Sequence, residues 1–187
     1  MNTLKLLACL SVLLLAQPGH AALPEGWRAS GSHPTEYDMF LDKGGSAPGG
    51  KAASVVRANV KAPQGFGTLM QSIDAGAYRG KRLRLSALVA SDGVAEWAGL
   101  WMRVDPKDRG APLAFDNMQG RPIKGKTGWT RREVVLDVAP EAAGIAYGLL
   151  LAGAGTVRMA DVKLEVVDRK VPTTGGLPDV PKNLDFE

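Results

Sequence analysis

Apolar and polar residues alternate along most of this chain with a period of two, which is the spacing of a β-strand that buries one face. Each alternating run ends at a cluster of Gly, Pro, Asp or Lys, residues that favour turns. The pattern predicts eight strands, at residues 53–58, 67–73, 82–90, 98–105, 113–118, 133–138, 145–151 and 157–167. A helix is expected only for a turn or two around Asp74 to Tyr78. We therefore predict an all-β fold, an antiparallel β-sandwich of the jelly-roll kind.

The two faces of the strand at 98–105 differ in their chemistry. One face carries only apolar side chains, those of Leu100, Met102 and Val104. The other carries an aromatic ring, a cation and a carboxylate, from Trp101, Arg103 and Asp105. The first face is expected in the core, and the second is expected to meet a ligand.

Same-face positions in the predicted strands give a candidate core. They are Leu83, Leu85, Leu100, Met102, Val134, Leu136, Leu149 and Leu151.

The first residues have the three parts of a secretory signal peptide. A cationic start that includes Lys5 precedes an apolar run at 6–16, and Gly19-His20-Ala21 fits a small-x-small cleavage site. The apolar run is too short to span a membrane. We expect residues 1–21 to be a signal peptide, the mature chain to start at Ala22 without a membrane span, and the protein to be periplasmic or secreted in a bacterial envelope.

The composition excludes some kinds of chemistry and some partners. The single cysteine, Cys9, lies in the predicted signal, which excludes disulfides and cysteine-based catalysis or metal binding in the mature domain. The formal net charge of +4 is spread without a run of five or more like charges, so nucleic acid is not an expected partner. Mild basicity suits an anionic envelope polymer, although ordinary solvated Lys and Arg are the commoner explanation.

The chain length allows one domain with a sizeable core, and 23 Gly with 12 Pro favour many turns. We assign residues 22–170 to the β-sandwich. Residues 171–187 are a Pro/Gly linker with a C-terminal segment. The segment at 183–187 either pairs as an edge strand or forms a loose tail.

Several motifs in their order resemble a known family. They are the segments 66–71, 78–86, 97–105, 115–118, 128–129, 134–138 and 148–151. Together they resemble a bacterial jelly-roll domain of unassigned function that is galactose-binding-like and related to carbohydrate-binding modules. Similar domains occur attached to AraC-type regulators and beside tail-processing serine peptidases. The resemblance covers nearly the whole mature chain and implies the fold more than the function.

The chain departs from the related sandwiches at two places. Where these often have paired aspartates that serve a structural calcium, this chain has only Asp161 in the run 157–162. Calcium takes 6 to 8 oxygen ligands, so no metal site is predicted. The segment 183–187 resembles the one that usually opens such domains, which suggests the edge-strand alternative for the tail.

No catalytic constellation stands out, and no cofactor is implied. His33 is the single histidine after the predicted signal, and the serines lack a nucleophile-elbow context. One enzymatic alternative is a carboxylate pair formed by Asp105 and Asp116 on adjacent strands, as glycoside hydrolysis requires. We expect a protein that is not an enzyme.

Binding makes better use of the same side chains, because flat aromatic rings suit sugars and a few polar groups fix their orientation. The candidate ligand-binding residues are Trp101, Arg103, Asp105, Asp116, Asn117, Arg121 and Trp129. Core packing is the alternative for each Trp, and a plain surface salt bridge is the alternative for Arg103 and Asp105.

The sequence thus predicts an exported, non-catalytic binding domain that recognises a carbohydrate or other small polar ligand on the concave sheet face. The partner would be a glycan or envelope polymer. The alternative is a protein partner, in a protein-interaction or sensory domain without a sugar ligand. An exposed apolar patch around Met70, Met102, Met118 or Met159 would favour that alternative.

Overall fold

The computed structural model describes residues 22–108, 110–175 and 184. Within them the chain forms nine strands and three short 3-10 turns. The strands are β1 (Arg28–Gly31), β2 (Tyr37–Ala47), β3 (Lys51–Ala58), β4 (Phe66–Asp74), β5 (Arg82–Pro106), β6 (Ala114–Asp116), β7 (Ile123–Asp137), β8 (Ala142–Ala152) and β9 (Thr156–Val167). The 3-10 turns are η1 (Pro34–Glu36), η2 (Pro48–Gly50) and η3 (Gly76–Tyr78).

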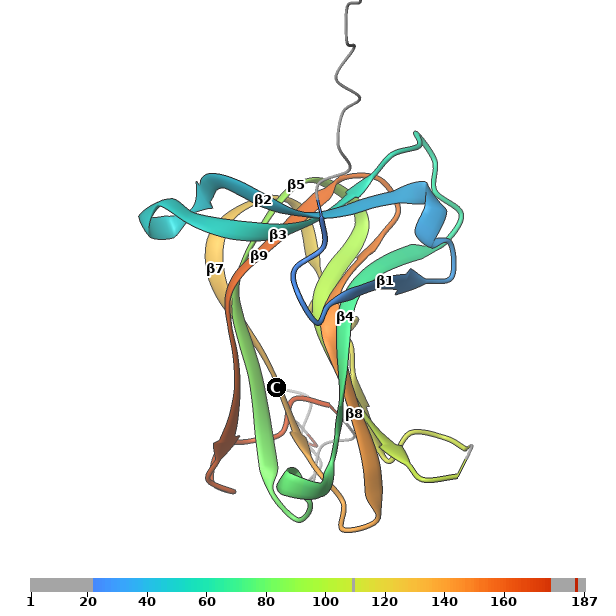
Figure 1. Cartoon of the computed structure of the whole chain (residues 1–187), viewed down its shortest axis with the longest axis vertical. Coiled ribbons are helices and arrows are strands. Elements are labelled where there is room, and N and C mark those ends of the chain that lie inside the picture. Colours follow the sequence, from blue (N-terminus) through green and yellow to red (C-terminus); the bar gives the residue numbers. More distant parts are fainter. Residues whose placement is uncertain (1–21, 109, 176–183, 185–187) are drawn as a thin grey trace, which may run out of the picture.

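All the strand pairs are antiparallel, and together they form one curled sheet that folds into a sandwich. The long strand β5 belongs to both layers. Its first half pairs with β7 and β9, and its second half pairs with β8 and β6. The front sheet is therefore β1-β4-β8, the second half of β5, and β6. The back sheet is β7, the first half of β5, β9, β3 and β2. In Figure 1 the long strands of the front sheet lie on the right, and those of the back sheet lie on the left.

The core lies between these two sheets, as the alternation predicted. All eight of the predicted core side chains are at most 2% exposed. They pack in one cluster with side chains from β3, β4 and β9, such as Val56, Leu69 and Met159. The jelly-roll β-sandwich expected from the sequence is confirmed.

Strand β5 differs from the two separate strands expected at 82–90 and 98–105. The chain continues as one strand, with register shifts against β7 between Val89 and Ala98. Gly93 in this stretch has φ +61°, a conformation that glycine adopts without strain. These irregularities bend the strand so that it can pass from the back sheet to the front sheet.

Two strands were not predicted from the sequence, β1 and β2. Residues 44–47, which include two glycines, extend β2 up to the turn η2. Figure 1 shows β2 and β3 lying across one end of the long strands. The helical turn expected around Asp74 to Tyr78 is present as η3.

Candidate functional site

The outer face of the front sheet carries aligned rows of side chains. One row runs Arg28, Met70, Gly148 and Trp101 across β1, β4, β8 and β5, because each is the register partner of the next. A parallel row joins Phe66, Ala152 and Trp97 across β4, β8 and β5. The alternate positions in these strands, including Leu69, Leu100 and Leu149, enter the core. The period of two thus separates a core face from a second apolar surface.

Trp101 lies across this outer face. Its indole Nε1 donates a hydrogen bond to Thr68 Oγ1 at 2.7 Å, although β8 separates the strands of the two residues. The β8 residue in register with Trp101 is Gly148, so no β8 side chain stands beside the indole at this position. Trp101 packs with Met70, Leu150 and neighbouring residues and is only 7% exposed. The ring therefore forms the floor of the surface and does not project from it.

Above this floor the face is hollowed. A hollow of about 300 Å³, here the Trp101 hollow, is lined by Arg28, Ser30, Gly31, Phe66, Thr68, Met70, Trp101, Arg103, Phe115 and Leu150. A second hollow of about 620 Å³, the Trp97 hollow, lies beside it and shares Phe66. It is formed by residues 61–66, 95–97 and 152–154.

The structure pairs Arg103, which lines the Trp101 hollow, with Asp105, which does not line it. Arg103 Nε lies 2.9 Å from Asp105 Oδ1 and donates a hydrogen bond to Oδ2 at 3.1 Å. The salt bridge given above as the alternative for these two residues is thus present. Arg103 also lines the hollow. Asp105 holds the guanidinium from one side, so Arg103 is positioned before any ligand arrives.

Asp116 and Arg121 form a separate cluster. Arg121 donates hydrogen bonds to both carboxylate oxygens of Asp116, and the Thr174 hydroxyl donates another. Burial raises the pKa of Asp116, but Arg121, Thr174 and the Met118 N–H together hold that pKa below its usual value. Asn117 accepts a hydrogen bond from the Gln119 N–H within the same loop. None of these three predicted residues lines the Trp101 hollow. Asp116 and Arg121 instead connect β6 and the β6–β7 loop to Thr174.

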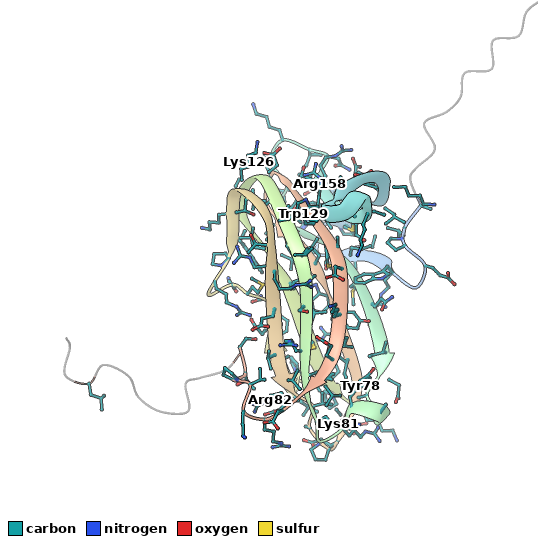
Figure 2. The ribbon with its side chains drawn as sticks, turned by 90° about the vertical axis from the view of Figure 1, so that its left-hand side faces the viewer. Tyr78, Lys81, Arg82, Lys126, Trp129 and Arg158 are labelled. Carbon is teal, nitrogen blue, oxygen red and sulfur yellow. The ribbon has the colours of Figure 1, made fainter. Side chains whose placement is uncertain are left out.

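Trp129 was expected beside the other candidate residues, but it lies on β7 in the back sheet. Its ring packs against the cluster of Ala47, Ala53 and Ala160, and its Nε1 donates to Ser46 O at 3.2 Å. Figure 2 places it near Arg158 and the β2–β3 hairpin, at the opposite end of the back sheet from Arg82. Trp129 and Trp101 therefore do not form one surface.

The hollow also contains residues that the sequence analysis did not select. Phe115 pairs in register with Arg103 and is 46% exposed, so its ring is available to a ligand. Phe66 shares the outer face of β4 with Thr68, and Arg28 comes from the unpredicted strand β1. Alternation in 66–70 marks Phe66 and Thr68 as same-face residues, but no local signal places Phe115 beside Arg103.

The carboxylate pair weighed as a catalytic alternative does not form. Asp105 is paired with Arg103, whereas Asp116 is buried and bound by Arg121. In the described part of the chain, no group of three or more His, Cys, Asp or Glu side chains could hold a metal ion. The Asp161 carboxylate, considered above for calcium, accepts a hydrogen bond from Arg131, which lowers its pKa.

Two observations concern a protein or membrane partner. All four methionines named for an exposed apolar patch, Met70, Met102, Met118 and Met159, are buried. Among the described residues, no helix has both the length and the apolar character needed to cross a membrane.

The fold is the jelly-roll β-sandwich that carbohydrate-binding modules also have. The C-terminal family 22 carbohydrate-binding module of Clostridium thermocellum Xyn10B superposes with a TM-score of 0.54 at 13% identity, covering 79% of this chain and 90% of that one. A Stig cyclase from Fischerella sp. TAU superposes with a TM-score of 0.57 at 17% identity, covering 79% and 88%. At such identities the likeness concerns the fold alone.

In sequence, the chain is 43% identical over 169 residues to an uncharacterized HTH-type transcriptional regulator of Bacillus subtilis, YbfP. The match covers 87% of this chain, and the chain spans 57% of the regulator's length. No protein-family model matches the chain.

Proposed function

We propose that this domain is a non-catalytic binding module that recognises a carbohydrate on the outer face of its front sheet. The observation that carries the proposal is the Trp101 hollow, where aromatic side chains and a few polar ones surround a surface depression. Sugar rings present flat apolar C–H faces with hydroxyls at their edges. Aromatic rings with sparse, oriented polar groups are complementary to that chemistry. The fold shared with carbohydrate-binding modules supports the same function.

Phe115 offers the cleanest test, because it is the exposed aromatic ring of the hollow. Phe115→Ala is expected to weaken glycan binding about tenfold or more through loss of ring stacking. Its free energy of unfolding should stay within about 0.5 kcal/mol of the wild type, as for other surface changes. Titration calorimetry against a glycan panel, with a denaturation curve for each variant, measures both.

Trp129→Ala is the matched aromatic control. It should leave glycan affinity unchanged, since Trp129 belongs to the back sheet. Loss of binding in Trp129→Ala with retention in Phe115→Ala would move the site to the other sheet. Trp101→Ala is a poorer probe, because removing so buried a ring is expected to cost about 3–5 kcal/mol of stability.

The proposal includes export. Residues 1–21 lie outside the described part of the structure, so the inference comes from the charged start, the apolar run and the Ala21 boundary. In a bacterial host, mass spectrometry of envelope fractions should find a protein that begins at Ala22. A cytoplasmic product that retains residues 1–21 would contradict export.

A further inference from the structure

The charged side chains that line the Trp101 hollow all have the same sign. Arg28 and Arg103 line it, and no Asp or Glu does so among its described lining residues. Arg28 comes from β1 and Arg103 from β5, with β4 and β8 between them. At about 4.8 Å per strand step, their backbones stand roughly 14 Å apart across the sheet. The hollow is therefore a surface with a cation on each side.

Both guanidinium groups are oriented by the protein and still have donors to offer. Arg28 Nη2 donates to Ser72 Oγ at 2.9 Å, while Arg103 is held through Nε by Asp105. Within the described residues, the terminal nitrogens of Arg103 have no hydrogen-bond partner. Its side chain is 45% exposed, so these donors can reach a ligand.

Among the side chains that line the hollow, only those of Ser30 and Thr68 carry an oxygen that can accept a hydrogen bond. The Thr68 hydroxyl is occupied, because it donates to Leu149 O at 2.9 Å and accepts from Trp101 Nε1. Arginine has donors and no acceptor. A neutral sugar needs both kinds of group for its hydroxyls, whereas a carboxylate accepts only and matches the planar guanidinium fork.

We propose that the ligand of this face is an acidic saccharide, one that carries uronic acid carboxylates. Arg28 and Arg103 bind the carboxylates, and the exposed ring of Phe115, paired in register with Arg103, packs against a sugar ring. This assignment rests on the proposed carbohydrate-binding function and specifies its substrate class.

The experiment compares trigalacturonic acid with its methyl ester by titration calorimetry on the purified protein. The two saccharides have the same rings and hydroxyls and differ in the charge of the carboxyl groups. The acid should bind at least about tenfold more tightly, and its affinity should fall as salt is raised. Arg28→Gln and Arg103→Gln should each weaken binding of the acid about tenfold and leave the ester unaffected.

Arg57→Gln is the matched control, since it removes the same charge from β3 in the back sheet, where Arg57 pairs with Asp38. It should leave the affinity for the acid unchanged. An equal loss in this variant would show that net charge alone drives binding, and would overturn the proposed site. Melting curves establish that each variant is folded.

The remaining outcomes separate the two proposals. If the acid and the ester bind with equal affinity, the ligand is not recognised by its charge. The same conclusion follows if a neutral glycan binds while the acid and the ester do not. Either result would overturn the acidic assignment but not the proposed carbohydrate binding. Preference for a sulfated trisaccharide over trigalacturonic acid would overturn the uronate assignment. If no glycan of the panel binds, both proposals fail.

Discussion

Asp116 lies at the centre of a polar cluster that joins β6 to the segment at 171–175. Besides its bonds from Arg121 and Thr174, it accepts one from the Met118 N–H at 2.9 Å. Thr174 in turn accepts a hydrogen bond at its hydroxyl from Val135 N, at 2.7 Å. A buried carboxylate with so many donors is stabilised in its ionised form.

This cluster makes part of the stability depend on pH. Because the pKa of Asp116 is lowered on folding, its contribution is fully present above the unfolded value of about 3.9 and is lost as pH falls through the folded value. Asp116→Asn should therefore cost about 1–3 kcal/mol at pH 7. The difference from wild type should shrink below about pH 4. Urea denaturation at pH 7 and pH 3 measures it.

The exposed Asp92 provides the comparison, and Asp92→Asn should change stability by less than about 0.5 kcal/mol at pH 7. A difference between wild type and Asp116→Asn that stays constant from pH 7 to pH 3 would contradict the assigned role of the Asp116 carboxylate.

For single residues, the alternation of apolar and polar positions within one strand correctly predicted which side chains share a face. It placed Trp101 and Arg103 on the face opposite Leu100 and Met102, as the structure has them. It could not predict that the Trp101 ring would be buried, because the residues that bury it, such as Met70 and Leu150, come from other strands. Nor could it predict that Asp116 accepts hydrogen bonds from Arg121 and Thr174, because the conformation of the loops brings these residues together.

At the scale of the strand, Gly148, the register partner of Trp101, allows the close approach of β8 to β4. A Cβ at this position would stand 2.2 Å from Leu69 O, on the backbone of β4. Gly148→Ala should therefore destabilise the protein by about 1–3 kcal/mol through steric strain. It should also disturb the Trp101 environment, visible in near-ultraviolet circular dichroism.

Gly128 in β7 is the matched control, since a Cβ there meets nothing within 4 Å. Gly128→Ala should leave both stability and the aromatic spectrum close to wild type. If Gly148→Ala were as well tolerated as Gly128→Ala, the close approach of β8 to β4 would not restrict position 148 to glycine.

The strands missed from the sequence share a cause. β1 has only four residues and no buried side chain, so it carries no alternation for a pattern to detect. In β2, polar and glycine residues occupy the second half, which has the composition of a turn. Pairing with β4 and β3, which is a property of the folded chain, makes both segments strands.

On the scale of the whole molecule, the passage of β5 between the layers gives the domain its two different outer surfaces. The front sheet has the aromatic hollow with its two arginines, and the back sheet has Trp129 over small alanines. The sequence predicted the sandwich, its core and the chemistry of one strand face. It grouped Trp129 with Trp101 because local patterns do not show on which sheet a face lies.

Mapping the ligand on the protein by NMR tests the proposed binding site most directly. On addition of trigalacturonic acid, backbone amides at 28–31, 66–70, 101–103 and 115 should show the largest chemical-shift changes, since these segments surround the Trp101 hollow. Amides of β2, β3 and β9 should stay nearly unchanged. Saturable changes centred on Trp129 and the back sheet would contradict the account, as would the absence of saturable changes with every glycan tried.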